Sequence, residues 1–154
     1  MESAGTGGLR APYVLEYTYR RSTGEVIGRF LAGLREGRIE GARTASGRVL
    51  VPAVEYDPES GEAIVDFVPV GERGTVTTWA WESAPRAHQP LDRPFAWALV
   101  RLDGADTAML HAVDAGSPDR MATGMRVRVR WAEKRVGSIQ DIACFEPVGE
   151  GDPS

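Results

Sequence analysis

The spacing of hydrophobic residues changes along this chain from a helical period to a strand period. Between residues 26 and 34, apolar side chains recur every three or four positions, which predicts an amphipathic helix. Ser22 and Glu25 have the spacing of a capping box in front of it, and Gly37 stands where it would end. Two internal glycines each cost about 1 kcal/mol relative to alanine. We therefore expect this short helix to depend on a packing partner.

Five later stretches have the composition and alternation of β-strands, and they span residues 74–83, 95–102, 107–114, 125–131 and 138–146. The second is apolar at nearly every position, which indicates burial on both faces. Asp103-Gly104 after it is a strong hairpin signal. Ser117-Pro118 after the third predicts a short helical turn. Five strands with a helical turn after the third is the order of an OB-fold barrel.

Alternation also predicts which side chains share a face. In the first barrel strand it places Thr75, Thr77, Trp79 and Trp81 together. In the last strand it places Cys144 beside Ile142. A further strand-like stretch, residues 64–70, contains Pro69 and is therefore expected at the edge or end of a sheet.

Residues 43–61 contain two similar turns of the form X-x-x-X-G and X-P-x-X-G. Cysteine at each X would make two zinc knuckles, because two thiolates three residues apart can hold one face of a tetrahedral ion. The X positions are instead Arg43, Ser46, Asp57 and Ser60, whereas the turn residues Gly47, Pro58 and Gly61 are present. The sequence therefore predicts a degenerate, metal-free zinc-ribbon-like segment that binds no zinc.

This frame and its surroundings resemble the zinc-ribbon/OB-fold family of acyl-CoA-associated proteins, the domain of unknown function thirty-five. The resemblance covers roughly residues 23–147. Besides the knuckle frame it is carried by a leading-helix motif and three strand motifs, at residues 30–37, 71–77, 94–102 and 124–131. The missing cysteines are the main departure from the family pattern. The fold implied is mainly β: a five-stranded OB-fold barrel preceded by an N-terminal α-helix and the metal-free ribbon.

The same resemblance implies a function in lipid or steroid metabolism. Members of this family are typically non-catalytic accessory subunits of thiolase-superfamily enzymes, namely acyltransferases, thiolases and lipid-transfer-type thiolases or aldolases, whose acyl-CoA site they help to form. Such a role requires no covalently bound cofactor, and a CoA thioester would be a ligand shared with the partner. The candidate acyl-CoA-binding residues are Arg73, Trp79, Trp81, Arg86, His88 and Arg93. The arginines can pair with CoA phosphates, and the tryptophans can form an apolar wall.

Two stretches are candidates for the partner interface. The N-terminal arm has three tyrosines in seven residues, a composition that suits interfaces because the ring is apolar and the hydroxyl can remain hydrated. The apolar stripe of the helix is the second. The candidate interface residues are Tyr13, Tyr17, Tyr19, Ile27, Phe30, Leu31 and Leu34. Packing of both stretches on the chain's own body is the alternative.

Charge and chemistry limit the other functions. The 154 residues carry 18 basic and 22 acidic side chains, which argues against a basic nucleic-acid module. Even so, a barrel with two tryptophans on one strand and Arg126, Arg128 and Arg130 on another has a single-stranded nucleic-acid-binding protein as an alternative. A stand-alone acyl-CoA-binding protein is a third possibility. No Ser-His-acid order, paired-carboxylate motif or phosphate loop is visible, so the chain by itself is expected to be non-catalytic.

The remaining expectations concern organisation and location. Residues 1–22 are predicted to be an extended arm, 23–71 the helix and ribbon, 72–148 the barrel, and 149–154 a disordered tail. Cys144 is the one cysteine, which fits a reducing cytoplasm. Neither an apolar run of membrane-spanning length nor a signal peptide is present in the sequence. Cys144 and His111 are expected to be buried and chemically inert, whereas His88 lies in a long proline-rich loop, residues 84–94.

Overall fold

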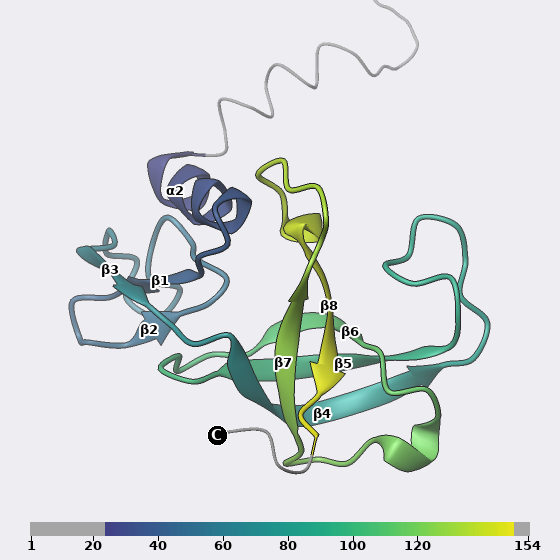
Figure 1. Cartoon of the computed structure of the whole chain (residues 1–154). Helices are drawn as coiled ribbons and strands as arrows, with labels where there is room; N and C mark the ends of the chain where they lie inside the picture. The colour runs from purple at the N-terminus through teal and green to yellow at the C-terminus, as the bar shows by residue number, and fades with distance from the viewer. Residues whose placement is uncertain (1–23, 150–154) are drawn as a thin grey trace, which may run out of the picture.

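The computed structural model describes residues 24–149, in which a helix and a small sheet lie on one side of a β-barrel (Figure 1). The helix is α2 (Gly24–Arg35). The small antiparallel sheet has the order β2-β1-β3 and consists of β1 (Glu40–Arg43), β2 (Val49–Leu50) and β3 (Asp66–Pro69). The predicted tyrosine-rich arm, the Ser22 cap and almost all of the predicted tail lie outside the described residues. As expected from Pro69, β3 is an edge strand.

The barrel closes in the order β4-β5-β6-β8-β7. Its strands are β4 (Arg73–Glu82), β5 (Phe95–Leu102), β6 (Met109–Val113), β7 (Arg126–Trp131) and β8 (Ile142–Pro147). A 3-10 turn, η1 (Pro118–Arg120), follows the third strand, and a second, η2 (Ile139–Asp141), precedes the last. This order and closure confirm the predicted five-stranded OB-fold barrel.

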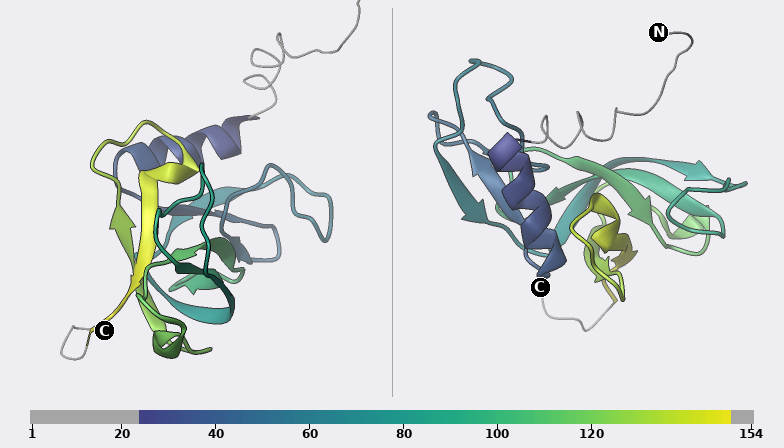
Figure 2. Two further views of the ribbon diagram at one scale, coloured as in Figure 1. Left: turned by 90° about the vertical axis from the view of Figure 1, so that its right-hand side faces the viewer. Right: turned by 90° about the horizontal axis from the view of Figure 1, so that it is seen from above.

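One hydrophobic core runs from the helix through the small sheet into the barrel. It includes Phe30 and Leu34 of α2, Ala42 and Leu50 of the small sheet, and Val100 of the barrel. Phe30 is 2% exposed and Leu34 0%. Figure 2 shows α2 between the small sheet and the turn that carries η2. The helix therefore finds its packing partner within its own chain.

Hydrogen bonds to side chains hold both ends of α2. Near its first turn, the Ile27 N–H donates to Glu55 Oε2 at 2.8 Å, so a carboxylate from a distant segment accepts an otherwise free helical amide. At its last residue, Arg135 Nε donates to the Arg35 carbonyl at 3.0 Å. The helix is thus fixed by the ribbon at one end and by the β7–β8 connection at the other.

The small sheet is also tied directly to the β5–β6 connection. Val49 N–H donates to Asp106 Oδ2 at 2.8 Å, and Asp106 N–H donates to the Val49 carbonyl at the same distance. Thr107 Oγ1 accepts from Val51 N–H at 2.9 Å and donates to the Val51 carbonyl at 3.1 Å. These hydrogen bonds give partners to backbone N–H and C=O groups along the edge of β2, which would otherwise be unpaired.

A β-bulge in β4 changes the predicted faces of the first barrel strand. The register shifts between Val76 and Thr78, which leaves Thr77 as the extra residue. After the shift, Trp79 and Trp81 lie opposite the buried residues Ala98 and Ala96 and pack against the core. The prediction that both tryptophans share one face with Thr75 was therefore wrong. The bulge lies between Thr75 and the tryptophans and reverses the alternation at that point.

A second irregularity corrects the last strand. Residues 138–141 form the capped turn η2 instead of strand, with Ser138 and Asp141 as a capping box. The β7–β8 register then shifts, so that Ile142 lies opposite Trp131 and Cys144 opposite Arg130. Ile142 joins the main core, whereas Cys144 joins a separate cluster on the outer face of the barrel. The expectation that these two side chains share a face was wrong for this reason.

Candidate functional site

The two degenerate knuckles meet through an ion pair. Thr44 N–H donates to the Arg48 carbonyl at 2.8 Å in the first turn, and Gly61 N–H donates to the Asp57 carbonyl at 2.7 Å in the second. Arg48 Nη1 lies 3.1 Å from Glu59 Oε2 and 4.0 Å from Asp57 Oδ1. A cation thus lies between the turns that would share a zinc ion in an intact ribbon.

Of the four degenerate ligand positions, Arg43 pairs with Asp66 on β3, and the Ser46 hydroxyl lies 3.0 Å from Thr44 Oγ1. Asp57 accepts from the Glu59 N–H at 2.8 Å. Within residues 24–149 there is no group of three or more histidine, cysteine, aspartate and glutamate side chains that could hold a metal ion. The absence of zinc remains a prediction.

A pocket of about 560 Å³ opens beside the barrel, where β6 and β8 separate. These strands pair in parallel at Val113 and Phe145, and the pocket lies on the N-terminal side of that pair. Its strand-borne lining is Trp97 of β5, Leu110 and His111 of β6, and Ile142 and Ala143 of β8. Ile139 and Gln140 of η2 form one rim, and His88, Gln89 and Pro90 of the β4–β5 loop form the other.

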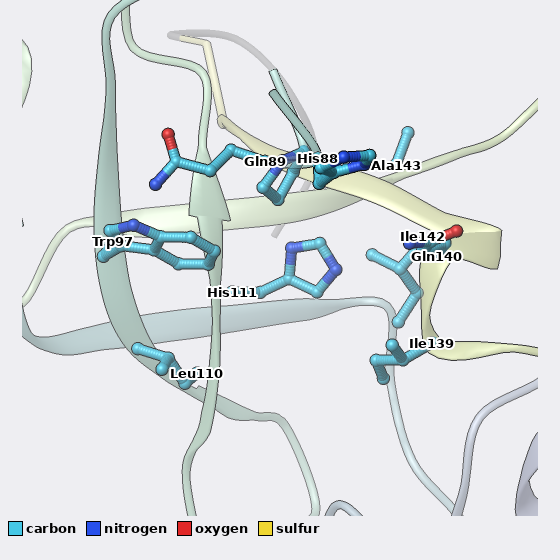
Figure 3. A pocket seen from close by; sticks show the side chains of 10 residues that line it. His88, Gln89, Trp97, Leu110, His111, Ile139, Gln140, Ile142 and Ala143 are labelled. Carbon is cyan, nitrogen blue, oxygen red and sulfur yellow. The ribbon is translucent and has the colours of Figure 1, made fainter. Parts of the chain in front are cut away.

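His111 lies at the centre of this pocket, between Trp97 on one side and Ile139 and Ile142 on the other (Figure 3). Its Nδ1 accepts from the Ala112 N–H at 2.8 Å. The neutral imidazole then carries its proton on Nε2. Burial lowers the pKa of His111 below its ordinary value, although backbone hydrogen bonds with Ile139 and Ile142 oppose this shift. The histidine is therefore an uncharged part of the pocket wall.

The mouth of the pocket exposes apolar side chains. Leu110 is 61% exposed and Ile139 40%. His88 on the opposite rim has a backbone φ of 75°, a conformation that is uncommon for residues other than glycine. Strain of this kind often marks functional loops. An open apolar rim with one strained loop residue is suited to contact with a ligand or another protein.

The predicted acyl-CoA-binding residues do not form one site. Only His88 lines the pocket. Trp79 and Trp81 are half-buried and pack against the core, and neither lines the pocket. Arg73 begins β4, whereas Arg86 lies in the loop after it, at the far end of the strand.

The last of the predicted arginines, Arg93, forms an ion pair with Asp114, which also receives Arg130 Nη1 at 3.0 Å. The hydrogen bond from Arg93 holds the pKa of Asp114 below its ordinary value. This arrangement ties the end of the long loop to the barrel. Arg93 therefore has a structural partner in addition to any role with CoA.

The arginine row of β7 is paired with carboxylates. Arg126 bonds to Asp103, with Nη2 to Oδ2 at 2.6 Å. Arg128 and Arg130 both donate to Glu146, at 2.9 and 2.8 Å. Because each guanidinium lies against an anion, this row offers a weak field for a phosphate backbone. The geometry disfavours the nucleic-acid alternative.

Some of the helix residues predicted for a partner interface are buried in the chain's own core. Phe30 and Leu34 are buried, so they are unavailable to another protein in this structure. Ile27 and Leu31 are half-buried. The three tyrosines of the predicted arm lie outside the described residues. Phe30 and Leu34 are therefore corrected from interface to core residues, because the small sheet and barrel cover them.

Cys144 is a poor nucleophile in this structure. It is buried with Phe95 and Ala112 under Leu91 and Trp97, and burial raises the pKa of its thiol to about 11. At neutral pH such a thiol is almost entirely protonated. This agrees with the expectation that the cysteine is inert.

Sequence reasoning missed the main pocket residues. The sequence places four of them in predicted strands but gives no sign that they share a site, because they are separated by up to 45 positions: Trp97, Leu110, Ile139 and Ile142. One signal was present: Leu110 is apolar and faces the solvent side of β6. Alternation alone could not show that an exposed leucine, a tryptophan and a helical turn converge there.

Among the described residues, no helix has the length and apolar character needed to cross a membrane. Residues 67–132 match the family described as the ChsH2 C-terminal OB-fold domain. Among curated proteins, none matches the chain.

Solved structures similar to the chain include two that are named for DUF35. The first, an Ltp2-ChsH2(DUF35) aldolase, is 20% identical, with a TM-score of 0.59, and the match covers 80% of this chain and 95% of that one. The second, a DUF35-family protein of unknown function from Sulfolobus solfataricus, is 19% identical, with a TM-score of 0.57, and the match covers 78% and 91%. DUF35 is the domain of unknown function thirty-five that the sequence resembles. The family match over residues 67–132 and this shared fold support the assignment of the chain to the OB-fold DUF35 family.

Proposed function

We propose that this protein is a non-catalytic accessory subunit that binds a thiolase-superfamily enzyme, of the lipid-transfer-type thiolase or aldolase class, and helps to form its acyl-CoA site. The observation that carries the proposal is the match of the barrel to the ChsH2 C-terminal OB-fold domain. It is supported by the fold shared with a chain of the Ltp2-ChsH2(DUF35) aldolase, 95% of which is covered.

The chemistry of the described residues supports a role without catalysis. The Cys144 thiol is buried and its pKa is raised to about 11. His111 has its Nδ1 occupied by the Ala112 N–H, and burial lowers its pKa. A nucleophile and a base within hydrogen-bond reach of each other are what covalent catalysis requires. These two side chains lie in different clusters, one in the outer-face cluster and one in the pocket wall.

The exposed apolar rim around Leu110 and Ile139 supports contact with a partner. Exposed apolar patches on a protein surface commonly mark interaction sites. In this proposal the partner covers part of this rim and supplies the reacting groups. The acyl-CoA then enters at the boundary between the two chains.

Co-expression with a thiolase-like protein encoded next to this chain tests the proposal. We expect a complex that remains intact through size-exclusion chromatography, and acyl-CoA turnover that needs both chains. A buried Phe30 is unsuitable as an interface probe, whereas Tyr17→Glu tests the predicted arm directly. Turnover by the purified chain alone, or no association with any thiolase-like protein of the host, would overturn the proposal.

Binding assays separate the other two functions. A stand-alone acyl-CoA-binding protein would bind its ligand without forming a complex. A nucleic-acid-binding protein would bind single-stranded oligonucleotides at physiological salt, with an affinity that depends on Arg128. We expect weak oligonucleotide binding with a shallow salt dependence, because the arginine row is paired with Glu146 and Asp103.

A further inference from the structure

We propose that the pocket where β6 and β8 separate binds an uncharged hydrocarbon or ring group of a small molecule, and that it does so on the isolated chain. The inference deepens the proposed function by giving the chemical class of a ligand group that this chain holds itself. It rests on the proposed function only for the metabolic origin of that ligand. The preference for an uncharged group follows from the pocket.

Charge is the first property of the pocket wall that selects a ligand. No aspartate, glutamate, lysine or arginine occurs among the described residues that line the pocket. Arg93, Arg130 and Asp114, which form ion pairs on the barrel, are outside the lining. A carboxylate or phosphate placed against this wall would lose hydration without gaining a counter-ion. The wall therefore selects against charged groups.

The central histidine, His111, is uncharged. Its Nδ1 accepts from the Ala112 backbone N–H at 2.8 Å. Phe145 lies edge-on to the imidazole, with ring centroids 5.9 Å apart. Because the Ala112 N–H occupies Nδ1 and burial lowers the pKa of the imidazole, His111 is a neutral member of the pocket wall.

The size and shape of the pocket also suit a small molecule. The volume of about 560 Å³ lies within the range of about 300–1,000 Å³ that is common for small-molecule sites. Trp97 and Leu110 form one wall, and Ile139 and Ile142 form the other (Figure 3). The polar side chains of Gln89 and Gln140 come from the loop and from η2, on opposite rims. The site thus combines apolar walls with neutral hydrogen-bonding groups at its entrance.

The pocket is a product of the topology. β6 and β8 are joined in parallel at Val113 and Phe145, and the strands are not paired further toward Leu110 and Ile142. The capped turn η2 then directs Ile139 to the opening. An opening between two barrel strands gives access to the interior without breaking the core, since Val113 and Phe145 are both fully buried.

The test uses the full chain, with 1-octanol as the neutral probe and octanoate and CoA as charged probes. Titrations are followed by backbone NMR shifts of His111, Leu110 and Ala143. We expect saturable binding of octanol at the pocket, with binding of octanoate weaker by about tenfold or more. Leu110→Glu, which places a charge at the exposed mouth, should weaken octanol binding by a similar factor.

Val65→Glu is the matched control, because Val65 is 62% exposed, like Leu110, but lies outside the pocket lining. It should leave octanol binding unchanged. Equal affinity for octanol and octanoate, shifts that do not saturate, or equal losses in the two variants would each overturn the inference. If only a partner protein's side chain occupies the pocket, octanol will fail to bind while the complex forms normally. That outcome refutes the inference and leaves the proposed function intact.

Discussion

Val113 and Phe145 form the pair that joins β6 to β8 in parallel and closes the barrel. Next to it, the Asp114 N–H donates to the Phe145 carbonyl at 2.8 Å. On the other side of the pair the strands diverge, and the uncharged pocket around His111 occupies the opening. Closure of the barrel and formation of the pocket therefore depend on the same short contact.

Two glycines of α2 should respond differently to replacement by alanine. At Gly28 an added Cβ meets no atom within 4 Å, so Gly28→Ala should raise the free energy of unfolding by about 0.5–1 kcal/mol. At Gly33 the same atom would lie 3.2 Å from the Arg38 carbonyl oxygen. Gly33→Ala should gain less or destabilise the fold. Urea unfolding of both variants checks this, and equal stabilisation by the two would contradict the packing of α2.

Folding should be independent of zinc. The knuckle turns are connected by Arg48 with Glu59 and Asp57, and the ligand positions offer no thiolate. We expect elemental analysis to find no stoichiometric zinc, and a strong chelator to leave the melting temperature unchanged. Near-stoichiometric zinc in protein purified without a metal-binding tag would show that the frame is misassigned.

Arg48→Ala should destabilise the ribbon by about 0.5 kcal/mol, because the pair is about one-third exposed on the arginine side and therefore partly screened. Asp57, which is 5% exposed, would then keep its backbone partners but lose its nearest cation. Arg38→Ala is the control, since it removes a more exposed ion pair with Glu36. The comparison is made by urea unfolding, and a larger loss in the control would contradict a bridging role for Arg48.

The fold should lose stability as the pH falls through about 6.5. Burial lowers the pKa of His111 in the folded state, so the unfolded chain binds a proton first, and stability decreases below the ordinary histidine pKa. Carboxylates whose pKa is lowered, such as Asp114 and Asp141, affect stability only at more acidic pH. His111→Gln should flatten the dependence between about pH 7 and 5. A control, His88→Gln, should retain it, because His88 is exposed.

Cys144 should be almost unreactive in the folded protein. With its pKa raised from 9.0 to about 11, the thiolate fraction at pH 8 falls by about a hundredfold, and the cover of Leu91 and Trp97 slows access further. Alkylation by iodoacetamide at pH 8, followed by mass spectrometry, measures this. The same thiol should react readily in urea. Fast reaction in native buffer would show that the outer-face cluster opens.

The local patterns determined the elements of this fold. An apolar spacing of three and four residues predicts α2, and Asp103-Gly104 predicts the β5–β6 hairpin, because these signals act between near neighbours in the chain. The β5 strand, almost continuously apolar, is buried at Ala96, Ala98 and Val100 on one face. The expectation of burial on both faces was wrong, because Trp97 and Leu99 on the other face are only half-buried and Arg101 is exposed. The strand order with a turn after the third was enough to predict the barrel.

Only the tertiary structure decided the faces and the pocket. A single bulged residue at Thr77 reverses the alternation ahead of Trp79, and a register shift does the same between Ile142 and Cys144. Side chains from β5, β6, η2 and β8 meet in the pocket because β6 and β8 pair at one point and then diverge. Such register and long-range pairing depend on contacts between distant segments. Periodicity within one segment carries no record of those contacts, which is why the sequence predicted the barrel but not the site on it.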